Sequence, residues 1–264
     1  VDTEAVDART REGIAAWVAG EGLDALVSCD GDADRPLVAG EDGALVPGDV
    51  LGPVAARLLG AELLCTPVTS NGLVEGIGLR VVRTRVGSPF VIAAMEAARA
   101  AAPGARVAGY EANGGFLLGF AAQGPAGPLA PLPTRDAMLP ILAALVAAKA
   151  AGGFAALRAG LPARFTASDR LQGVDLGRAA AFLARVGGDG AARAAFLDGI
   201  GREEGLDRTD GLRLRLAGGE ALHLRPSGNA PEFRVQVEAG GEARAAALLA
   251  RALARVAGAI GAGG

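Results

Sequence analysis

Strand-like and helix-like segments alternate through the first half of the chain, and this alternation is the strongest constraint on its fold. The strand-like segments are short and apolar, and they cover residues 23–29, 62–66, 79–83 and 106–109. The helix-like segments show helical spacing or begin at capping residues, and they cover residues 7–20, 49–60, 70–77, 89–101 and 134–150. Strands that alternate with helices favour an α/β layer built on a largely parallel or mixed sheet.

A different pattern begins after residue 160. Residues 160–171 are polar and irregular, so we expect a linker there, and we expect a loop at residues 124–133. The segments that follow are typical of a hairpin, a strand and an amphipathic closing helix, at residues 211–217, 220–225, 232–238 and 242–260. This order predicts a small α+β domain. Another hairpin is expected where Leu37–Ala39 and Ala44–Val46 flank the turn Gly-Glu-Asp-Gly.

Composition excludes several classes of partner. The chain has 264 residues, 51% hydrophobic and 21% charged, so it is globular and long enough for one to three domains. Its net charge of −3 argues against nucleic acid, because backbone phosphates bind a basic face. The longest apolar run, Ala137–Ala148, is broken by Pro140 and is too short to span a bilayer. Cys29 and Cys65 lack metal-ligand spacing, which favours two buried thiols in a cytoplasmic protein.

The strongest local signal is the segment Asp30-Gly31-Asp32-Ala33-Asp34-Arg35, which directly follows the strand-like run ending at Cys29. Three carboxylates at alternate positions of a tight turn converge their oxygens, and this donor set suits a hard cation such as Mg²⁺. The small residues Gly31 and Ala33 leave the backbone free to curl around the ion. A solvated acidic turn that binds no ion is the alternative.

An EF-hand is a second interpretation of this segment, because Glu41 falls at the twelfth position when Asp30 is counted as the first. The sixth position of an EF-hand loop is a glycine, whereas this chain has Arg35 followed by Pro36. An EF-hand loop also follows a helix, whereas this one follows a strand. We therefore disfavour the EF-hand.

Two further segments offer groups that bind sugars. In Glu111-Ala112-Asn113-Gly114-Gly115, a carboxylate and an amide two residues apart could bind adjacent sugar hydroxyls, although such a segment is also an ordinary turn. Arg83 and Arg85 present two guanidinium groups before the flexible Gly87.

The segment Arg225-Pro226-Ser227-Gly228-Asn229 lies between two strand-like runs and could hold a phosphate. It offers an arginine, a hydroxyl, an amide side chain and a glycine that frees backbone N–H groups. A plain hairpin connection has the same composition and stays open as the alternative.

In this order and at these separations, the four segments resemble the motifs of the α-D-phosphohexomutase family, and the resemblance covers essentially the whole chain. It implies that Asp30, Asp32 and Asp34 bind the catalytic Mg²⁺ and that Arg35 lies beside the reacting phosphate. The implied sugar-binding residues are Glu111, Asn113, Arg83 and Arg85, and the implied phosphate-binding residues are Arg225, Ser227, Gly228 and Asn229.

The chain departs from the family pattern at several positions. Asn113 stands where the family usually has serine, and Gly115 stands where it usually has histidine, so no role of that histidine can be carried over. The only histidine, His223, is expected to be structural. No segment matches the loop of the reactive phosphoserine. Thr166–Asp169 has a superficial likeness to it, but we expect Ser168 to be a helix cap or turn former.

The resemblance also implies three domain segments. Residues 1–47 correspond to the C-terminal part of domain two with the metal loop, residues 48–160 to a full domain three for sugar recognition, and residues 161–264 to domain four with the phosphate loop. The expected fold is thus a mixed-sheet α/β part followed by a small α+β domain, without the phosphoserine domain. Residues 1–47 should then present an uncovered sheet edge or face.

By resemblance, the parent protein is a phosphohexomutase, with phosphomannomutase favoured, that interconverts hexose 6-phosphate and hexose 1-phosphate through a phosphoserine and Mg²⁺. Its implied partners are mannose or glucose phosphates and a missing N-terminal half; neither nucleic acid nor a membrane is expected. This chain alone is expected to be inactive. The alternatives are a non-catalytic sugar-phosphate-binding fragment, half of a split enzyme, and a Mg²⁺-dependent phosphatase with an aspartate nucleophile in the metal loop.

Overall fold

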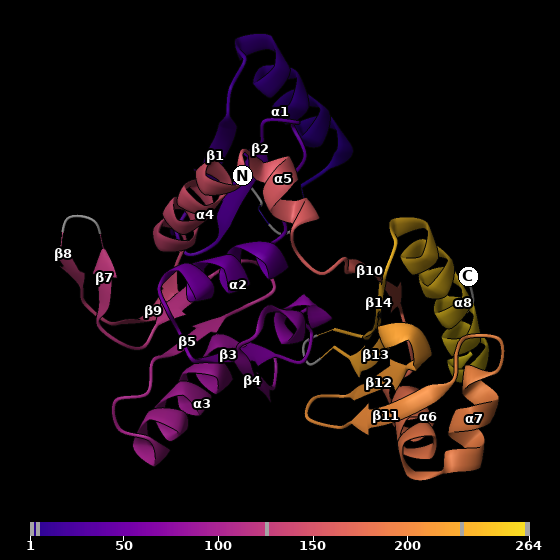
Figure 1. Ribbon diagram of the computed structural model, residues 1–264. Helices are drawn as coiled ribbons and strands as arrows, with labels where there is room; N and C mark the ends of the chain where they lie inside the picture. Colours follow the sequence, from indigo (N-terminus) through magenta and orange to yellow (C-terminus); the bar gives the residue numbers. More distant parts are fainter. Residues whose placement is uncertain (1–2, 4–5, 125–126, 228–229, 262–264) are drawn as a thin grey trace. The chain divides into compact units, whose positions relative to one another are not determined.

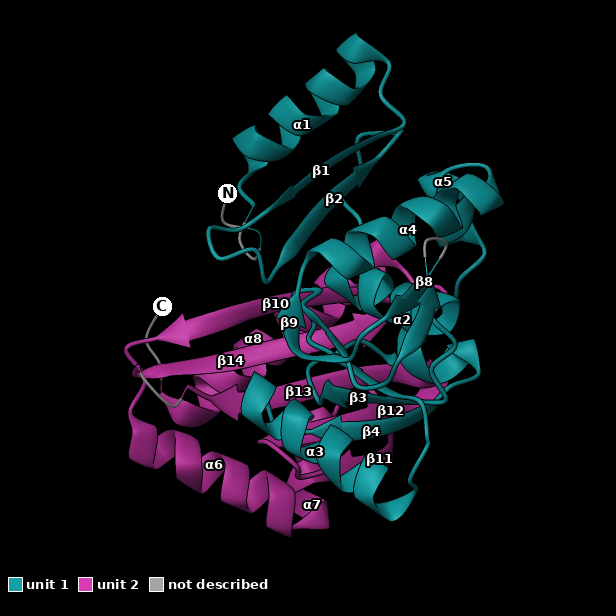
Figure 2. Cartoon of the chain, turned by 90° about the vertical axis from the view of Figure 1, so that its left-hand side faces the viewer, with its two compact units in different colours: residues 1–162 teal, residues 163–264 magenta. Residues whose placement is uncertain are grey.

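The computed structural model describes residues 3, 6–124, 127–227 and 230–261. The chain forms two compact units, residues 1–162 and 163–264, which Figure 2 shows in different colours. Within the described residues, no helix has both the length and the apolar character needed to cross a membrane.

The main sheet of unit 1 has five strands in the order β4-β3-β5-β6-β9 (Figure 1). β3 (Leu63–Pro67) pairs in parallel with β4 (Arg80–Thr84) and with β5 (Val107–Tyr110). β6 (Phe116–Leu118) pairs antiparallel with β5, and β9 (Leu132–Asp136) pairs antiparallel with β6. The sheet is therefore mixed, and the predicted α/β class is confirmed.

Helices cover both faces of this sheet. The helical segments are α2 (Gly48–Leu58), the 3₁₀ helix η1 (Gly72–Ile77), α3 (Ser88–Ala101), α4 (Met138–Ala151) and α5 (Phe154–Ala159). In β3, Leu64 packs in the apolar cluster that includes Ala55 of α2, whereas its neighbour Cys65 packs with Met95 of α3. Since adjacent residues of a strand point to opposite faces, both faces of the sheet are buried.

A small antiparallel sheet precedes the main one. β1 (Ala25–Cys29) and β2 (Pro36–Gly40) pair along their whole length, and α1 (Ala8–Glu21) contacts both strands. The segment from Asp30 to Arg35 is thus the turn of a hairpin. Val27 of β1 stays 45% exposed, so this sheet is not fully covered by the described residues. Both cysteines are free thiols, and Cys65 is buried whereas Cys29 is only half-buried, contrary to the prediction.

The predicted hairpin around Gly-Glu-Asp-Gly forms with short arms, because the Gly40 N–H donates to the Ala44 carbonyl at 3.0 Å and the Val46 N–H donates to the Val38 carbonyl at 2.8 Å. Its turn is closed by the Gly43 N–H, which donates to the Gly40 carbonyl at 2.9 Å, and Ala39 and Leu45 form an antiparallel bridge. The second arm is short because Pro47 is already the N-cap of α2. β2 makes its longer ladder with β1.

Within the predicted loop at residues 124–133, residues 125–126 lie outside the described residues and strands occupy most of the others; the predicted helix start at Thr134 is wrong. β7 (Ala122–Gly124) and β8 (Gly127–Leu129) form a separate antiparallel pair, and β9 begins at Leu132. α4 begins at Met138, because the Asp136 carboxylate accepts the N–H groups of Met138 at 3.2 Å and Leu139 at 2.7 Å. These hydrogen bonds satisfy donors that a helix start leaves unpaired.

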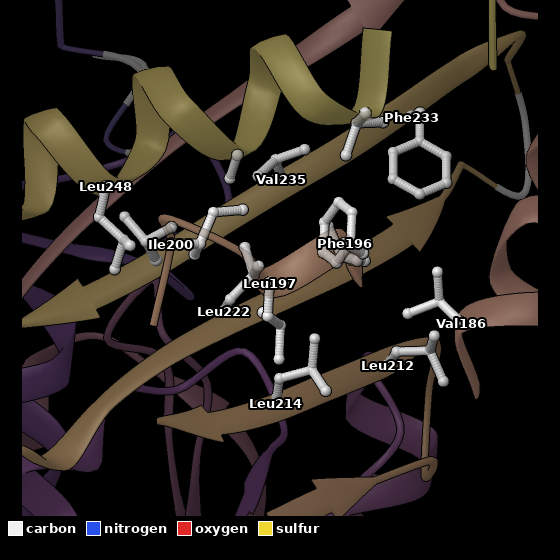
Figure 3. Close-up of a cluster of buried hydrophobic side chains, with 14 of the residues drawn as sticks. Val186, Phe196, Leu197, Ile200, Leu212, Leu214, Leu222, Phe233, Val235 and Leu248 are labelled. Carbon is white, nitrogen blue, oxygen red and sulfur yellow. The ribbon is translucent and has the colours of Figure 1, made fainter. Parts of the chain in front are cut away.

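Unit 2 is built on one antiparallel sheet in the order β10-β14-β13-β12-β11. The strands are β10 (Phe165–Gln172), β11 (Glu203–Asp207), β12 (Leu212–Leu216), β13 (Glu220–Pro226) and β14 (Glu232–Ala239); the helical segments are α6 (Leu176–Gly188), α7 (Gly190–Leu197), η2 (Ala217–Gly219) and α8 (Glu242–Ile260). Apolar side chains of the sheet pack against these helices (Figure 3). Phe182 anchors this core with edge-to-face contacts to Phe196 and Phe233.

The predicted linker at residues 160–171 contains a strand. β10 pairs with β14 over eight residues, with Ser168 opposite Gln236, so Ser168 is neither a helix cap nor a turn former. Most of β10 is exposed because it is an edge strand of the sheet, and this explains its polar sequence. The domain limits after residues 47 and 160 stay predictions; the two compact units meet at Pro162–Ala163.

Candidate metal loop and substrate-binding loops

The first aspartate of the metal loop (Asp30–Arg35) holds the loop in shape. Asp30 Oδ1 accepts the backbone N–H of Asp34 at 3.2 Å and that of Arg35 at 3.1 Å. The Asp30 N–H in turn donates to the Arg35 carbonyl at 3.2 Å and closes the hairpin. Ala33 is left-handed, with φ of 59°, a backbone conformation that costs free energy for a residue other than glycine.

The three aspartates of this loop converge. Asp30, Asp32 and Asp34 each offer a carboxylate oxygen, and these oxygens all lie within 4.8 Å of one another. Asp34 Oδ1 is buried and accepts no hydrogen bond from the residues that the structure describes. A buried acceptor without a hydrogen bond, beside two further carboxylates, fits a hard divalent cation, so these residues fit Mg²⁺.

The environments of Asp30 and Asp34 shift their pKa values in opposite directions. Burial raises the pKa of Asp30, but hydrogen bonds from the N–H groups of Arg35 and Asp34 outweigh it, and this pKa lies below its usual value. Burial raises the pKa of Asp34, and Arg135 opposes the shift without cancelling it, while Asp32 and Asp30 add to it. A cation at the loop would relieve this repulsion.

Arg35 lies against the same carboxylates. Its Nε atom is 3.4 Å from Asp30 Oδ2 and 3.4 Å from Asp34 Oδ1. About a third of its side chain, 30%, remains exposed. The guanidinium is thus held at the metal loop with part of its surface in solvent, where it can meet an anionic group.

The sugar loop (Glu111–Gly115) is a tight turn between β5 and β6. The Gly114 N–H donates to the Glu111 carbonyl at 2.8 Å, and the Asn113 side chain accepts the Gly115 N–H at 3.1 Å. Gly114 has φ of 93°, which favours glycine. Glu111 is 7% exposed, and its Oε2 accepts from the Ser88 hydroxyl at 2.8 Å.

Arg83 and Arg85 differ in their surroundings. Arg83 is 12% exposed at its side chain, donates to the carbonyls of Pro67, Ser70 and Asn71, and forms an ion pair with Glu75 at 2.7 Å. Arg85 is exposed, and its guanidinium lies 4.7 Å from the centre of the Phe90 ring. Sugar binding by either arginine stays a prediction.

Arg135, which is not among the residues predicted from the sequence, joins the metal loop to the sugar loop. Arg135 Nη2 forms an ion pair with Asp34 Oδ2, and Nη1 donates to Glu111 Oε2 at 3.1 Å. Burial lowers the pKa of Arg135, but Glu111 and Asp34 outweigh it, so this pKa is raised. One signal could have revealed Arg135: it directly precedes Asp136, whose side chain caps the start of α4. The sequence pattern instead predicts that both residues lie within the helix.

The described part of the phosphate loop lies at the end of β13. Arg225 Nη1 donates to Asp210 Oδ2 at 3.2 Å, and the Ser227 N–H donates to the Glu232 carbonyl at 2.8 Å. His223 of the same strand is buried, and burial lowers its pKa. Gly228 and Asn229, two predicted phosphate-binding residues, lie outside the described residues.

Comparison with known proteins extends these observations. The family described as "Phosphoglucomutase/phosphomannomutase, alpha/beta/alpha domain III" matches residues 48–165. A phosphomannomutase of Sinorhizobium fredii is 47% identical over 96% of this chain and 54% of its own length, and one of Salmonella muenchen is 38% identical over 97% and 54%. This chain therefore spans about half the length of the curated relatives it matches.

Solved structures show the same fold. A phosphoglucomutase/phosphomannomutase family protein from Burkholderia thailandensis matches with a TM-score of 0.71 and 18% identity, over 98% of this chain and 51% of its own. N-acetylphosphoglucosamine mutase of Aspergillus fumigatus, solved in complex with GlcNAc-6P and magnesium, matches with a TM-score of 0.59 and 17% identity, over 88% and 52%. The family match and the two phosphomannomutases show that the chain belongs to the α-D-phosphohexomutase family.

Proposed function

We propose that this chain carries the metal, sugar and phosphate loops of a phosphomannomutase-like phosphohexomutase, which interconverts hexose 6-phosphate and hexose 1-phosphate. The observation that carries the proposal is the ion-pair network in unit 1, where Asp34 of the metal loop and Glu111 of the sugar loop share Arg135. The preference for mannose rests on the two phosphomannomutases that match nearly the whole chain.

In this proposal, Asp30, Asp32 and Asp34 hold Mg²⁺, which, when bound, offsets negative charge on the phosphoryl group being transferred. Arg35 binds an oxygen of the same phosphoryl group through the exposed part of its guanidinium. The two hydrogen bonds that Asp30 Oδ1 accepts from backbone N–H groups keep the loop in shape for the ion before it binds.

Sugar hydroxyls are assigned to the neighbouring loop. The Glu111 carboxylate accepts from a hydroxyl while Ser88 and Arg135 fix its orientation. Asn113 binds an adjacent hydroxyl, and Arg85 and Arg83 are the other proposed sugar-binding residues. Arg83 also holds the segment before η1 through its contacts with backbone carbonyls.

In unit 2, Arg225 and Ser227, with Gly228 and Asn229 of the same loop, bind the phosphate that is not transferred. Asp210 holds the Arg225 guanidinium by an ion pair at 3.2 Å. The reaction also needs a phosphoryl carrier, which the family resemblance assigns to a phosphoserine outside these 264 residues. Cytoplasmic location is part of the same proposal.

Calorimetry on the purified chain tests this function. Mannose 1-phosphate and glucose 1-phosphate would be titrated with and without Mg²⁺ into the wild type, Arg225→Ala and Arg202→Ala. Arg202 is a matched control, because it carries the same charge in unit 2 and its side chain is 76% exposed. Binding that Arg225→Ala loses and Arg202→Ala keeps supports the proposal, and the tighter sugar indicates the substrate. Equal binding by both variants contradicts it.

Catalysis is tested separately from binding. The chain would be assayed for conversion of mannose 1-phosphate to mannose 6-phosphate, first alone and then with the N-terminal half of the Sinorhizobium fredii relative. Activity only in the mixture indicates a split or shortened mutase. Binding without conversion in either assay indicates a sugar-phosphate-binding module instead.

A further inference from the structure

Arg135 occupies a position between two acidic side chains of different loops. Its side chain is 26% exposed, whereas those of Asp34 and Glu111 are 15% and 10% exposed. Because Arg135 contacts both carboxylates with different nitrogen atoms, one positive charge is shared between two negative ones. In a partly buried setting such a charge interacts with its partners more strongly than at the surface.

The backbone around Arg135 is fixed to both loops. Asp136 pairs with Phe116 of β6, the strand that leaves the sugar loop. The Ala137 N–H donates to the carbonyl of Ala33 in the metal loop at 3.2 Å. The two residues that follow Arg135 are therefore attached to the same two loops that its guanidinium bridges.

The Arg135 side chain packs directly against Gly115, where a larger residue would leave it no room. A Cβ atom at position 115 would lie 3.0 Å from Arg135 Cδ and 2.9 Å from the Asp34 carbonyl oxygen. Both distances are tighter than side chains normally allow, so any larger residue there would push Arg135 away from the metal loop. The glycine and the arginine thus form one packed arrangement.

We propose that Arg135 is a positioning residue that makes cation binding by the metal loop depend on the charge of Glu111 in the sugar loop. This inference rests on the proposed function of the two loops. When Glu111 is charged, it binds Nη1 of Arg135 and offsets part of the positive charge beside Asp34. When the Glu111 charge is removed, Arg135 acts on Asp34 alone and opposes a divalent cation there, because like charges repel.

A double-mutant cycle read by Mg²⁺ affinity tests the inference. Calorimetry on the whole chain would compare the wild type, Glu111→Gln, Arg135→Met and the double variant. Methionine keeps much of the packing against Gly115 while it removes the charge. We expect Arg135→Met to tighten Mg²⁺ binding. Glu111→Gln should weaken Mg²⁺ binding by about threefold or more when Arg135 is present. In the Arg135→Met background the same change should weaken it by less than about twofold.

An equal factor for Glu111→Gln in both backgrounds would overturn the inference. Arg135→Lys guards against misfolding of the methionine variant, since it keeps the charge but its single ammonium cannot bridge two carboxylates in the same way. With lysine, the effect of Glu111→Gln should again fall below about twofold, and an undiminished effect would overturn the bridging role.

Failure of the metal site itself gives a different result. Asp32→Asn should abolish Mg²⁺ binding, and Arg135 makes no contact with Asp32 among those described here. If the wild type binds no Mg²⁺, both the proposed metal function and this inference fail. If the wild type binds Mg²⁺ and Asp32→Asn does not, but the cycle shows no coupling, only this inference fails.

Discussion

The imidazole of His223 makes a hydrogen bond with the backbone carbonyl of Asp210, with Nε2 2.6 Å from the oxygen. A carbonyl oxygen only accepts, so Nε2 carries the proton and donates. The Asp210 carboxylate accepts from Arg225 at 3.2 Å. One residue thus connects the only histidine of the chain to the arginine of the phosphate loop.

The lowered pKa of the buried His223 should make the free energy of unfolding depend on pH. Burial lowers its pKa below the usual 6.5, and nearby Arg225 and Arg213 lower it further against the opposing hydrogen bond to Asp210. The unfolded chain therefore binds the proton first, so the free energy of unfolding should fall as pH drops below about 6.5. Below the folded pKa, His223 causes no further fall.

Urea unfolding between pH 7 and pH 5 would measure this fall, with His223→Gln as the control that cannot titrate. The variant should lose the part of the slope that belongs to the histidine. An imidazole titration by NMR should have its midpoint below 6.5, and a midpoint at or above that value would contradict the prediction.

Removal of one partner from the buried ion pair of unit 2 should be costly. Arg213 Nη2 donates to Glu238 Oε1 at 2.9 Å, and the two side chains are only 10% and 4% exposed. Glu238→Leu leaves the arginine buried without this partner and should lower the free energy of unfolding by about 3–5 kcal/mol. Urea denaturation would measure the loss.

The double variant Arg213→Met/Glu238→Leu is the informative comparison for this pair. It removes both charges of this pair, so most of the lost stability should return. If Glu238→Leu alone is as stable as the wild type, the ion pair does not carry the predicted role.

Glu41 should stabilise α5 from a distance. Gly153, the residue before this helix, has no capping side chain, and Glu41 instead accepts the N–H groups of Phe154 at 2.7 Å and Ala155 at 3.0 Å. Glu41→Gln should lower the free energy of unfolding by about 1 kcal/mol, because the amide has one acceptor oxygen in place of two. Thermal unfolding of unit 1 would measure the change.

The contribution of the Glu41 carboxylate to the free energy of unfolding should depend on pH. Hydrogen bonds from Ala155, followed by smaller effects that include the N–H of Phe154, hold the pKa of Glu41 below its usual 4.5. Its contribution to stability is therefore complete above about pH 4.5 and is lost as pH falls through the folded pKa. The difference between wild type and Glu41→Gln should shrink in that range, and a difference that grows on acidification would refute the prediction.

Gly48 should tolerate no side chain. It opens α2 against the sugar loop, and a Cβ atom there would lie 2.5 Å from the carbonyl carbon of Asn113. Gly48→Ala should lower the free energy of unfolding by about 3 kcal/mol, because backbone atoms must move. Gly13→Ala is the control: α1 leaves open space there, and the change should stabilise by about 0.5–1 kcal/mol. Equal effects at the two positions would show that the contact does not matter.

The elements predicted well are those whose sequence pattern follows from burial. β3 is buried at every position and mostly apolar because helices cover both faces of the sheet, so the run around Leu64 and Cys65 predicts a strand without further information. β10 is the opposite case. Its residues are mostly polar, and it is a strand because β14 offers a partner along its whole length, which no local pattern reveals.

Some residues of the candidate site could likewise be predicted from the sequence, and one could not. Asp30, Asp32 and Asp34 are close in sequence, so their convergence follows from one turn and could be predicted. Arg135 meets Asp34 and Glu111 only because β9 is added beside β6 in the main sheet. The sequence pattern predicts a helix over residues 134–150, in which the side chain would point elsewhere, so the arginine cannot be recognised from the sequence.

The division of the chain at Pro162–Ala163 has a practical use, because the chain passes from one unit to the other only once. Ligation at a single peptide bond can then join two separately produced pieces, and isotopes can be confined to residues 163–264. In such a protein the labelled imidazole would be that of His223, beside Asp210 and the phosphate-loop arginine. One resonance would thus report ligand binding at that loop, free from overlap with signals of the other 162 residues.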